Sequence, residues 1–205
     1  MNLRLHASVR EGMRTLAVPA LALGLAALAG CRMNVDTQAF IERDEKRFTT
    51  AGPVDLDLNT FDGSIELRSW DRPEVLVEIE KRGQDKEAVD RITVTAAQKG
   101  NAVTVDVQHN GRTTVIGIGH FISTSARLIV TAPRSANVTA RTGDGSIVLE
   151  RIDGRVDLRT GDGSIKVVEA KGDVLAESGD GTLTLDDVSG RVEARTDDGS
   201  VRVSG

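Results

Sequence analysis

The sequence Thr-Gly-Asp-Gly-Ser-Ile stands at residues 142–147 and again at residues 160–165, and close variants stand at residues 178–183 and 196–201. A glycine also recurs every nine residues from Gly145 to Gly199. The residues two and four positions after each of these glycines are all aliphatic. Alternation of apolar and polar residues over five positions indicates a strand with one buried face. This stretch therefore predicts a regular array of short strands and turns.

The nine-residue segments are of two kinds, which makes the repeating unit 18 residues long. One kind ends in the Thr-Gly-Asp-Gly turn, and the other ends in a corner that carries an apolar residue, namely Ile152, Ala170 or Val188. Glycine supplies backbone conformations with positive φ, and aspartate suits the neighbouring turn position. Each unit is thus expected to contain two strands and two different turns.

The same unit occurs much earlier in the chain. Residues 56–65 align with residues 156–165, and Trp70 takes the corner place of Ile152. After this corner the next strand is expected to begin at Val75. Residues 56–79 and 128–205 therefore belong to one array, and residues 80–127 form an insertion. The insertion is expected to hold strands at 92–96 and 103–107 and a short helix at 87–91.

Two architectures fit a period of nine residues with one strand and one turn. One is an antiparallel meander, which would need a second layer to cover its apolar face. The other is a solenoid whose coils stack about 4.8 Å apart. The apolar corners suit the inside of a coil, and Arg159, Glu177 and Arg195 would alternate in charge along the stack. We predict an all-β fold, a short β-solenoid of 18-residue coils with an inserted β region.

The N-terminal residues read as a secretion signal. Three arginines precede an apolar run at residues 15–30, which is too short to span a bilayer. The run ends in Leu28-Ala29-Gly30-Cys31, which resembles the bacterial lipobox. This resemblance implies a signal peptide at residues 1–30 and a membrane anchor through lipid on Cys31. An ordinary signal peptide with a chance cysteine is the alternative, although Cys31 is the only cysteine in the chain.

The anchor implies an exported protein that is tethered to a membrane. Residues 31–49 are expected to be the lipidated cysteine and a polar tether. The residue after the cysteine is Arg32 rather than aspartate, which favours the outer membrane where two membranes exist. Translation could start at Met1 or at Met13, because the segment from Met13 makes a compact signal by itself.

Composition narrows the possible partners. The formal net charge is −5, and the signal segment carries more arginine than acid, so the remainder is more acidic still. An acidic surface without a basic patch argues against nucleic acid as a partner. The chain has four Phe, one Trp and no Tyr, so the core must be built from aliphatic residues.

The sequence as a whole resembles a known bacterial family. The opening Leu-x-Leu-x-x-x-Asp-Gly-Ser-Ile-Glu-Leu-x-x-Trp-Asp at 56–71, the strand Leu-Ile-Val-Thr-Ala-Pro at 128–133 and the repeated Gly-Asp-Gly-Ser-Ile carry the resemblance. They are similar to the "putative adhesin" domain of unknown function in envelope proteins. The resemblance covers about residues 50–205 and implies an exported β-solenoid module. It brings no catalytic residues with it.

The repeated aspartates are the best candidates for chemistry. The column consists of Asp144, Asp162, Asp180 and Asp198, and Asp62 stands at the related early position. Stacked carboxylates repel one another, and Ca²⁺ could relieve this. Calcium-binding nonapeptides, however, need a doubled glycine that this chain lacks, so the expectation is no metal and no cofactor. Each aspartate would then bond its own turn and face water.

We predict a non-enzymatic envelope interaction module, adhesin-like or a scaffold, with an unknown envelope protein or glycan as partner. The alternatives are a glycan-processing β-helix enzyme, which would use paired aspartates, and a calcium-binding repeat protein. Against the enzyme, aromatic platforms are scarce, and His109 and His120 are the only histidines after the signal.

A last expectation concerns residues 201–205. Val201 and Val203 belong to a strand with no capping segment after it, and uncapped solenoids expose their core. This predicts end-to-end association with a second copy or with a partner's strand. The alternative is that the last half-coil folds over and caps itself.

Overall fold

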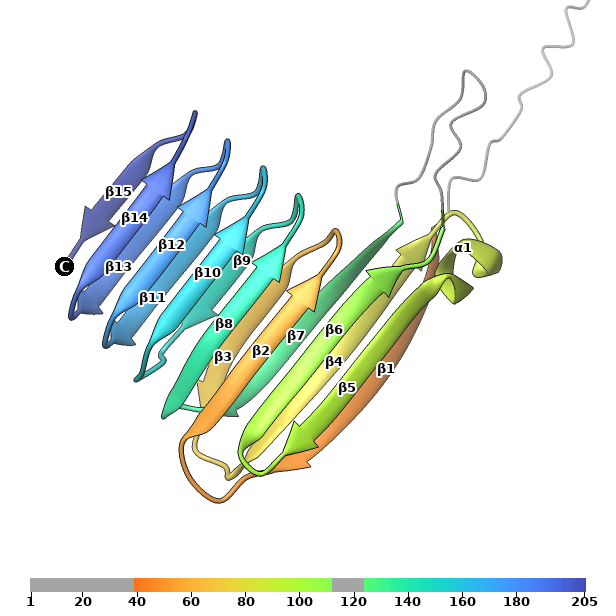
Figure 1. The fold of residues 1–205 in the computed structure, drawn as a ribbon, viewed down its shortest axis with the longest axis horizontal. Coiled ribbons are helices and arrows are strands. Elements are labelled where there is room, and N and C mark those ends of the chain that lie inside the picture. The colour runs from red at the N-terminus through yellow and green to blue at the C-terminus, as the bar shows by residue number, and fades with distance from the viewer. Residues whose placement is uncertain (1–38, 112–123) are drawn as a thin grey trace, which may run out of the picture. The chain divides into compact units, whose positions relative to one another are not determined.

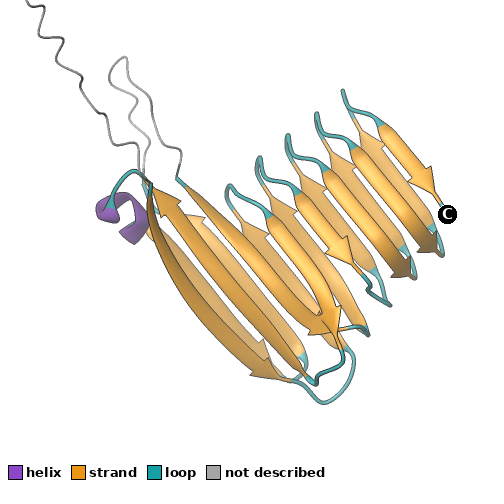
Figure 2. Cartoon of the chain, turned by 180° about the vertical axis from the view of Figure 1, so that it is seen from behind, coloured by secondary structure: helices purple, strands orange, loops and turns teal. Residues whose placement is uncertain are grey.

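The computed structural model describes residues 39–111 and 124–205. In this part of the chain nearly all residues with regular structure lie in strands, which form two sheets (Figures 1 and 2). The larger sheet has the strand order β1 (Phe40–Thr49), β4 (Glu74–Gly83), β7 (Ser125–Pro133), β3 (Ile65–Trp70), β9 (Ile147–Glu150), β11 (Ile165–Lys171), β13 (Leu183–Ser189) and β15 (Val201–Ser204). The smaller sheet has the order β14 (Val192–Thr196), β12 (Val174–Ser178), β10 (Val156–Thr160), β8 (Ala136–Thr142), β2 (Val54–Thr60), β6 (Ala102–His109) and β5 (Ile92–Lys99). The all-β prediction is confirmed.

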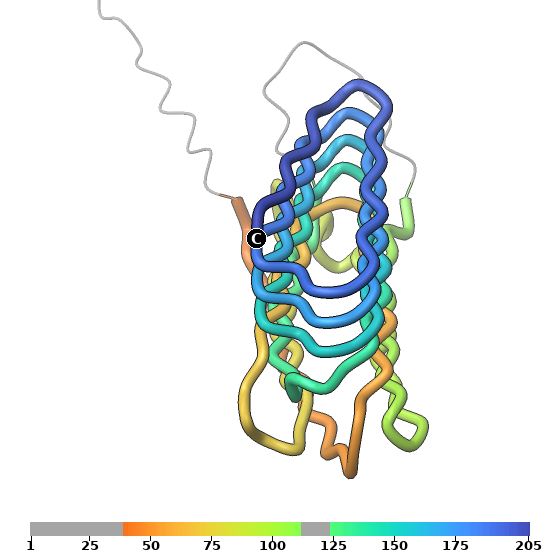
Figure 3. The backbone as a smooth tube through the Cα atoms, turned by 90° about the vertical axis from the view of Figure 1, so that its left-hand side faces the viewer, coloured from red at the N-terminus to blue at the C-terminus, as the bar shows by residue number. Residues whose placement is uncertain are grey.

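The repeats form a parallel stack, as Figure 3 shows in a view along it. In the smaller sheet, Val156 pairs with Val138 on one side and with Val174 on the other. In the larger sheet, Ile165 pairs with Ile147 and Leu183 in the same parallel manner. The stacked strands are β8 (Ala136–Thr142), β9 (Ile147–Glu150), β10 (Val156–Thr160), β11 (Ile165–Lys171), β12 (Val174–Ser178), β13 (Leu183–Ser189), β14 (Val192–Thr196) and β15 (Val201–Ser204). Parallel pairing excludes the meander and confirms a solenoid-like arrangement.

The early copy of the repeat joins this stack. Strand β2 (Val54–Thr60) pairs in parallel with β8, so that Leu56 lies beside Val138. Strand β3 (Ile65–Trp70) pairs in parallel with β9, so that Ile65 lies beside Ile147. Buried and exposed residues alternate without exception along β2. Residues more than 70 positions apart thus form adjacent coils.

The strand after Trp70 lies in the other sheet from the one predicted. Strand β4 (Glu74–Gly83) runs antiparallel to β7 in the larger sheet, with Val77 beside Val130. Its counterpart Val138 lies in the smaller sheet. Both flanks of β2 are already occupied by β6 and β8, so no place remains for β4 beside β2. The strand predicted to begin at Val75 is therefore present, but it lies in the larger sheet rather than in the smaller sheet that holds Val138.

The predicted insertion at 80–127 is only partly separate from the stack. Strand β6 (Ala102–His109) pairs in parallel with β2, and β7 (Ser125–Pro133) pairs in parallel with β3. These two strands flank the early repeat unit as another coil would. Most of β7 lies in the predicted array rather than in the insertion. Among residues 80–111 and 124–127, the end of β4, the strand β5 (Ile92–Lys99), which is antiparallel to β6, and the helix α1 (Lys86–Asp90) depart from the parallel stack. Asp85 caps this helix by accepting a hydrogen bond from the Ala88 N–H.

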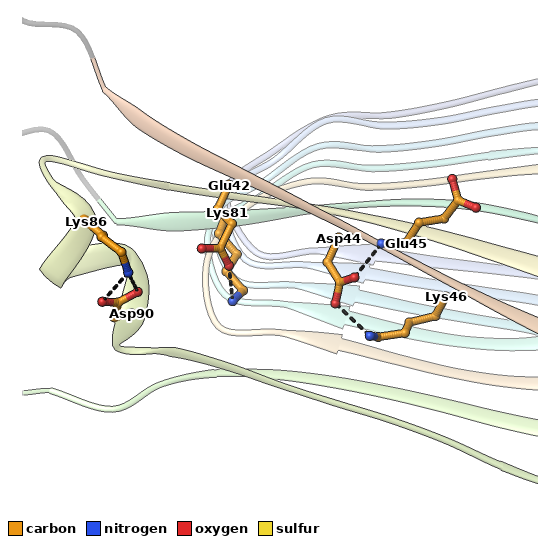
Figure 4. A network of polar contacts seen from close by, with 7 residues as sticks. All are labelled: Glu42, Asp44, Glu45, Lys46, Lys81, Lys86 and Asp90. Atoms are coloured by element: carbon orange, nitrogen blue, oxygen red, sulfur yellow. Dashed lines mark hydrogen bonds and ion pairs between the residues drawn. The ribbon is translucent and has the colours of Figure 1, made fainter.

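The tether prediction is wrong for residues 40–49. These residues form β1 (Phe40–Thr49), an edge strand antiparallel to β4. Charged residues on both strands pair across the edge: Arg43 lies 2.8 Å from Glu80, and Lys81 lies 2.9 Å from Glu42, as Figure 4 shows for the latter pair. The strand has almost no apolar alternation because the edge is exposed. Its backbone pairing with β4 determines its structure.

The two sheets enclose one core of aliphatic side chains, with contributions from strands β2 to β13. The corner residues Ile152 and Ala170 are fully buried, and Val188 packs against the core. These corners therefore close the coil from the inside, as the sequence predicted. Phe48 and Phe61 are the phenylalanines packed against this core.

Candidate functional site

The Thr-Gly-Asp-Gly turns are held together by a column of hydroxyl groups. Thr160 donates its hydroxyl hydrogen bond to the Gly145 carbonyl of the preceding turn, at 2.7 Å. The same oxygen accepts a bond from the Gly163 N–H of its own turn, at 3.2 Å. The column consists of Thr142, Thr160, Ser178 and Thr196. Because buried polar groups need partners, each hydroxyl links one turn to the next.

The glycines of these turns are required by close approach of backbones. A Cβ atom on Gly145 would lie 1.7 Å from the Gly63 carbonyl oxygen, and one on Gly163 would lie 2.0 Å from the Gly145 carbonyl oxygen. The sequence interpretation of positive φ holds instead at the opposite corners, where Gly172 has φ of 125° and Gly190 has φ of 135°. Close approach to a backbone carbonyl oxygen requires glycine in both turn types, and the corner glycines Gly172 and Gly190 have positive φ in addition.

The aspartate column lies on the tips of the turns. Asp144, Asp162, Asp180 and Asp198 are all exposed. Asp62 is only half-exposed, and burial, together with the charge of Asp144, raises the pKa of its carboxyl. Within residues 39–111 and 124–205, no three acidic, histidine or cysteine side chains are grouped so as to hold a metal ion. The stack brings Asp62 and Asp144 together without adding a third ligand.

Charged side chains on the outer face of the smaller sheet form a second column. Glu177 lies 3.3 Å from Arg159 on one side and 3.3 Å from Arg195 on the other. These three residues belong to β10, β12 and β14, in the alternation that the sequence predicted. Each exposed pair of this kind contributes little stability, about 0–1 kcal/mol. The column fixes register more than it stabilises the fold.

A cavity of about 360 Å³ lies where three loops meet near the early corner. Trp70 lines it, and its indole N–H donates to the Glu74 carbonyl at 2.8 Å. The Arg72 guanidinium stands over the indole, 4.9 Å from the ring centroid. Arg134 also lines the cavity and lies 3.0 Å from Asp153. The sequence analysis treated Trp70 only as a corner plug and did not find this site.

The same cavity contains a polar group without a partner. Thr50 is 5 % exposed, and its hydroxyl makes no hydrogen bond within the described residues. Its backbone N–H donates to the Pro73 carbonyl at 2.9 Å, which fixes the loop. The site therefore combines an indole, two guanidinium groups and a buried hydroxyl. No sequence motif links these residues, because they lie at 50, 70–72 and 134.

The far edge of the stack is exposed. Val201 is 46 % exposed and Val203 is 57 % exposed, although both belong to β15 and alternate as core residues do. Val192 and Ala194 on β14 are half-buried. Strands β14 and β15 are edge strands, as are β5 and β1 at the opposite edges of the two sheets. The exposure on which the predicted association depends is therefore present.

Several predicted features fall outside the described residues. These are the signal segment, the lipobox Leu28-Ala29-Gly30-Cys31, the first part of the tether, and His120. His109 lies inside them, and its ring centroid is 5.4 Å from that of Phe61. The helix found in the described part of the chain is too short to cross a membrane.

The parallel two-sheet stack with glycine turns defines a class of repetitive β modules, and comparison with known proteins gives the family. The Toastrack DUF4097 model matches residues 54–205, and the chain belongs to this family. The earlier resemblance to an adhesin-like family of unknown function is thereby confirmed.

Two solved structures are similar to the chain. A "putative cell adhesion protein" from Clostridium sporogenes has a TM-score of 0.57 at 11% identity, and the match covers 80% of this chain and 99% of the other. This likeness shows a shared fold. A "putative adhesin" from Parabacteroides distasonis, at 12% identity, has a TM-score of 0.25 over 80% of this chain and 97% of the other. No curated protein shows significant similarity in sequence.

Proposed function

We propose that this protein is an exported, lipid-anchored adhesion or scaffold module of the bacterial cell envelope, and that it is not an enzyme. One observation carries the proposal: the polar side chains of the repeat bind one another. Thr160 links two turns, and Glu177 lies between two arginines. These groups build a rigid framework rather than a centre for chemistry. The family and the fold shared with a protein described as a cell adhesion protein support this role.

The anchor is proposed from the N-terminal sequence. Leu28-Ala29-Gly30-Cys31 would direct lipid to Cys31, and two or three acyl chains would hold the protein firmly in a membrane. The absence of aspartate after Cys31 favours the outer membrane in cells with two membranes. The stacked domain would then stand outside the cytoplasm at the membrane surface.

The unit of the framework is proposed to be a coil of 18 residues. Val156, Val174 and Val192 are successive partners in one sheet at this spacing. Each coil would lengthen the stack by about 4.8 Å, the distance between paired strands. Repetition would give the module a defined length with little flexibility, which suits a spacer that presents a binding site.

The binding site of this module is proposed to be the cavity at Trp70, with an anionic saccharide as its ligand. Arg72 and Arg134 line the cavity with guanidinium groups, which bind carboxylate or phosphate well. Arg72 lies 3.7 Å from Glu74 and Arg134 lies 3.0 Å from Asp153, and Asp71 also lines the cavity, so an anionic ligand would share these guanidinium groups with the protein's own carboxylates. The indole offers an apolar face beside them, and the Thr50 hydroxyl is buried behind this surface rather than presented to a ligand. The competing function, glycan processing, would require the turn aspartates to cleave a glycosidic bond with their carboxylates.

One titration separates binding from catalysis. Trp70 is the only tryptophan, so its fluorescence reports directly on the cavity. Acidic oligogalacturonate should change this fluorescence, and neutral dextran oligosaccharide should not. The oligogalacturonate should also be recovered at its original chain length after incubation.

Matched variants make the titration specific. Arg72→Gln should remove the response, whereas Arg68→Gln, which changes an exposed arginine on β3 outside the cavity, should keep it. An equal response to the neutral sugar, or a response that survives Arg72→Gln, contradicts the proposed site. Shortened oligogalacturonate would favour the enzyme instead.

A further inference from the structure

The two ends of the sheets differ in how their edge strands are protected. At one end, β1 carries charged residues that pair with β4, including Arg43 with Glu80 and Lys81 with Glu42. Charged residues on an edge strand discourage pairing with another chain unless the facing strand carries opposite charges at the matching positions. At the other end, β15 exposes Val201 and Val203. The other edge strand at the first end, β5, carries one charged residue, Lys99, so charge does not distinguish the two ends in both sheets. The exposed valines of β15 point to the edge formed by β14 and β15 as one suited to pairing.

The sequence of β14 is complementary to itself in the antiparallel direction. The strand reads Val192-Glu193-Ala194-Arg195-Thr196. If two copies pair antiparallel about Ala194, Glu193 of each copy lies opposite Arg195 of the other. Opposite charges in directly facing positions stabilise a strand pair, and like charges destabilise it. A two-fold axis repeats this contact, so two such charge pairs form together. In the single chain Arg195 already contacts Glu193 of its own strand and Glu177 of β12, so the pairs across the axis would extend this network.

We propose that two copies of this chain associate edge to edge through β14 and β15, with the β14 strands antiparallel about Ala194. Val192 and Ala194 on β14 alternate with the charged residues and face the core side of the sheet. On β15, Val201 and Val203 likewise lie on either side of a charged residue and face the core side of their sheet. Pairing continues both sheets across the contact and buries these aliphatic side chains. The contact is independent of the lipid anchor and of the Trp70 cavity.

The experiment measures the mass of the full chain by sedimentation equilibrium, with detergent micelles in excess over protein. The wild-type chain should sediment as a dimer. Glu193→Arg sets arginine opposite arginine, and Arg195→Glu sets glutamate opposite glutamate. Each single reversal should weaken the dimer at least about ten-fold. The double reversal restores opposite charges and should recover dimerisation.

Controls separate association from folding and from general charge. Lys166→Glu reverses an exposed charge on β11, away from the edge, and should leave the dimer intact. Melting temperatures identify any variant that fails to fold, and Val203→Lys tests the β15 side of the contact in the same way. A monomeric wild type at about 100 µM, or a dimer that both single reversals leave unchanged, overturns the proposal. Single reversals that the double variant does not rescue overturn the antiparallel register.

Discussion

At the scale of single residues, the Thr-Gly-Asp-Gly motif is explained by contacts between successive turns. Residue 163 must be glycine because a Cβ atom at this position would collide with the Gly145 carbonyl oxygen of the preceding turn. Thr160 is needed because its hydroxyl both donates to that carbonyl and accepts from the Gly163 N–H. The motif therefore encodes the distance between coils as well as the local turn.

Replacing Gly163 by alanine should destabilise the domain. The new Cβ would meet a backbone oxygen at 2.0 Å, and the backbone of two turns would have to shift. The expected loss in the free energy of unfolding is about 1–3 kcal/mol. Gly52→Ala is the matched control, because its Cβ meets only the Asn101 side chain, at 3.3 Å. Equal denaturation midpoints for the two variants would refute the close-approach explanation.

Thr160→Val should also be costly, because it keeps the shape and removes the hydroxyl. Thr160 is 8 % exposed, so the Gly145 carbonyl and the Gly163 N–H would lose a buried partner. We expect a loss of about 1–3 kcal/mol in urea denaturation. Thr104→Val, at an exposed position of β6, should change stability by less than about 0.5 kcal/mol. The hydroxyl column has no structural role if both variants behave alike.

Asp62 should make stability depend on pH. Burial and the charge of Asp144 raise the pKa of Asp62 in the folded protein, so folding favours its protonated form. Its contribution is fully present below the unfolded pKa of about 3.9 and is lost as pH rises through the raised folded pKa. Asp62→Asn should therefore raise the melting temperature at pH 7 and give no such gain at pH 3.

The neighbouring carboxylate provides the control for this effect. Asp144→Asn removes the charge that disfavours ionised Asp62 and should also raise the melting temperature at pH 7. The double variant should gain less than the sum of the two single changes, because both relieve the same repulsion. Full additivity, or a gain at pH 3 as large as at pH 7, would show that the two groups do not interact.

At the scale of elements, strands with an alternating pattern could be predicted and edge strands could not. The pattern in β2 and β10 reflects one buried face, which the sequence displays locally. Strand β1 has no such pattern, because its structure depends on pairing with β4, whose facing residues lie between 25 positions (Thr49 with Glu74) and 43 positions (Phe40 with Gly83) further along the chain. The sheet to which β4 belongs could not be predicted either, since it depends on which strands pair with β2. Local periodicity carries none of this information.

The turn element should not bind calcium specifically. The repeated aspartates are exposed on the turn tips, and the described residues hold no group of three metal-ligating side chains. Calorimetric titration of the protein with CaCl₂ should show no stoichiometric binding in the micromolar range. Stoichiometric binding with a large rise in melting temperature, abolished by Asp162→Asn, would reverse this conclusion.

At the scale of the whole molecule, the repeat predicted the solenoid-like stack and its exposed edge at Val201 and Val203. It did not predict that β6 extends the stack, because β6 lies in the segment interpreted as an insertion and carries no glycine turn motif, whereas most of β7 lies within the predicted array. The cavity at Trp70 was beyond prediction for a different reason. Its residues come from three loops that only the completed fold brings together.

The claim that joins the parts of the molecule is that a rigid stack is held at a membrane through Cys31. Detergent phase partitioning of the wild-type chain and of Cys31→Ser, expressed in a bacterial host, tests it most directly. The wild type should enter the detergent phase and begin at a cysteine with the added mass of a diacylglyceryl group. Cys31→Ser should stay in the aqueous phase or remain uncleaved. A Cys31→Ser protein that is cleaved normally and still enters the detergent phase would contradict the lipid anchor.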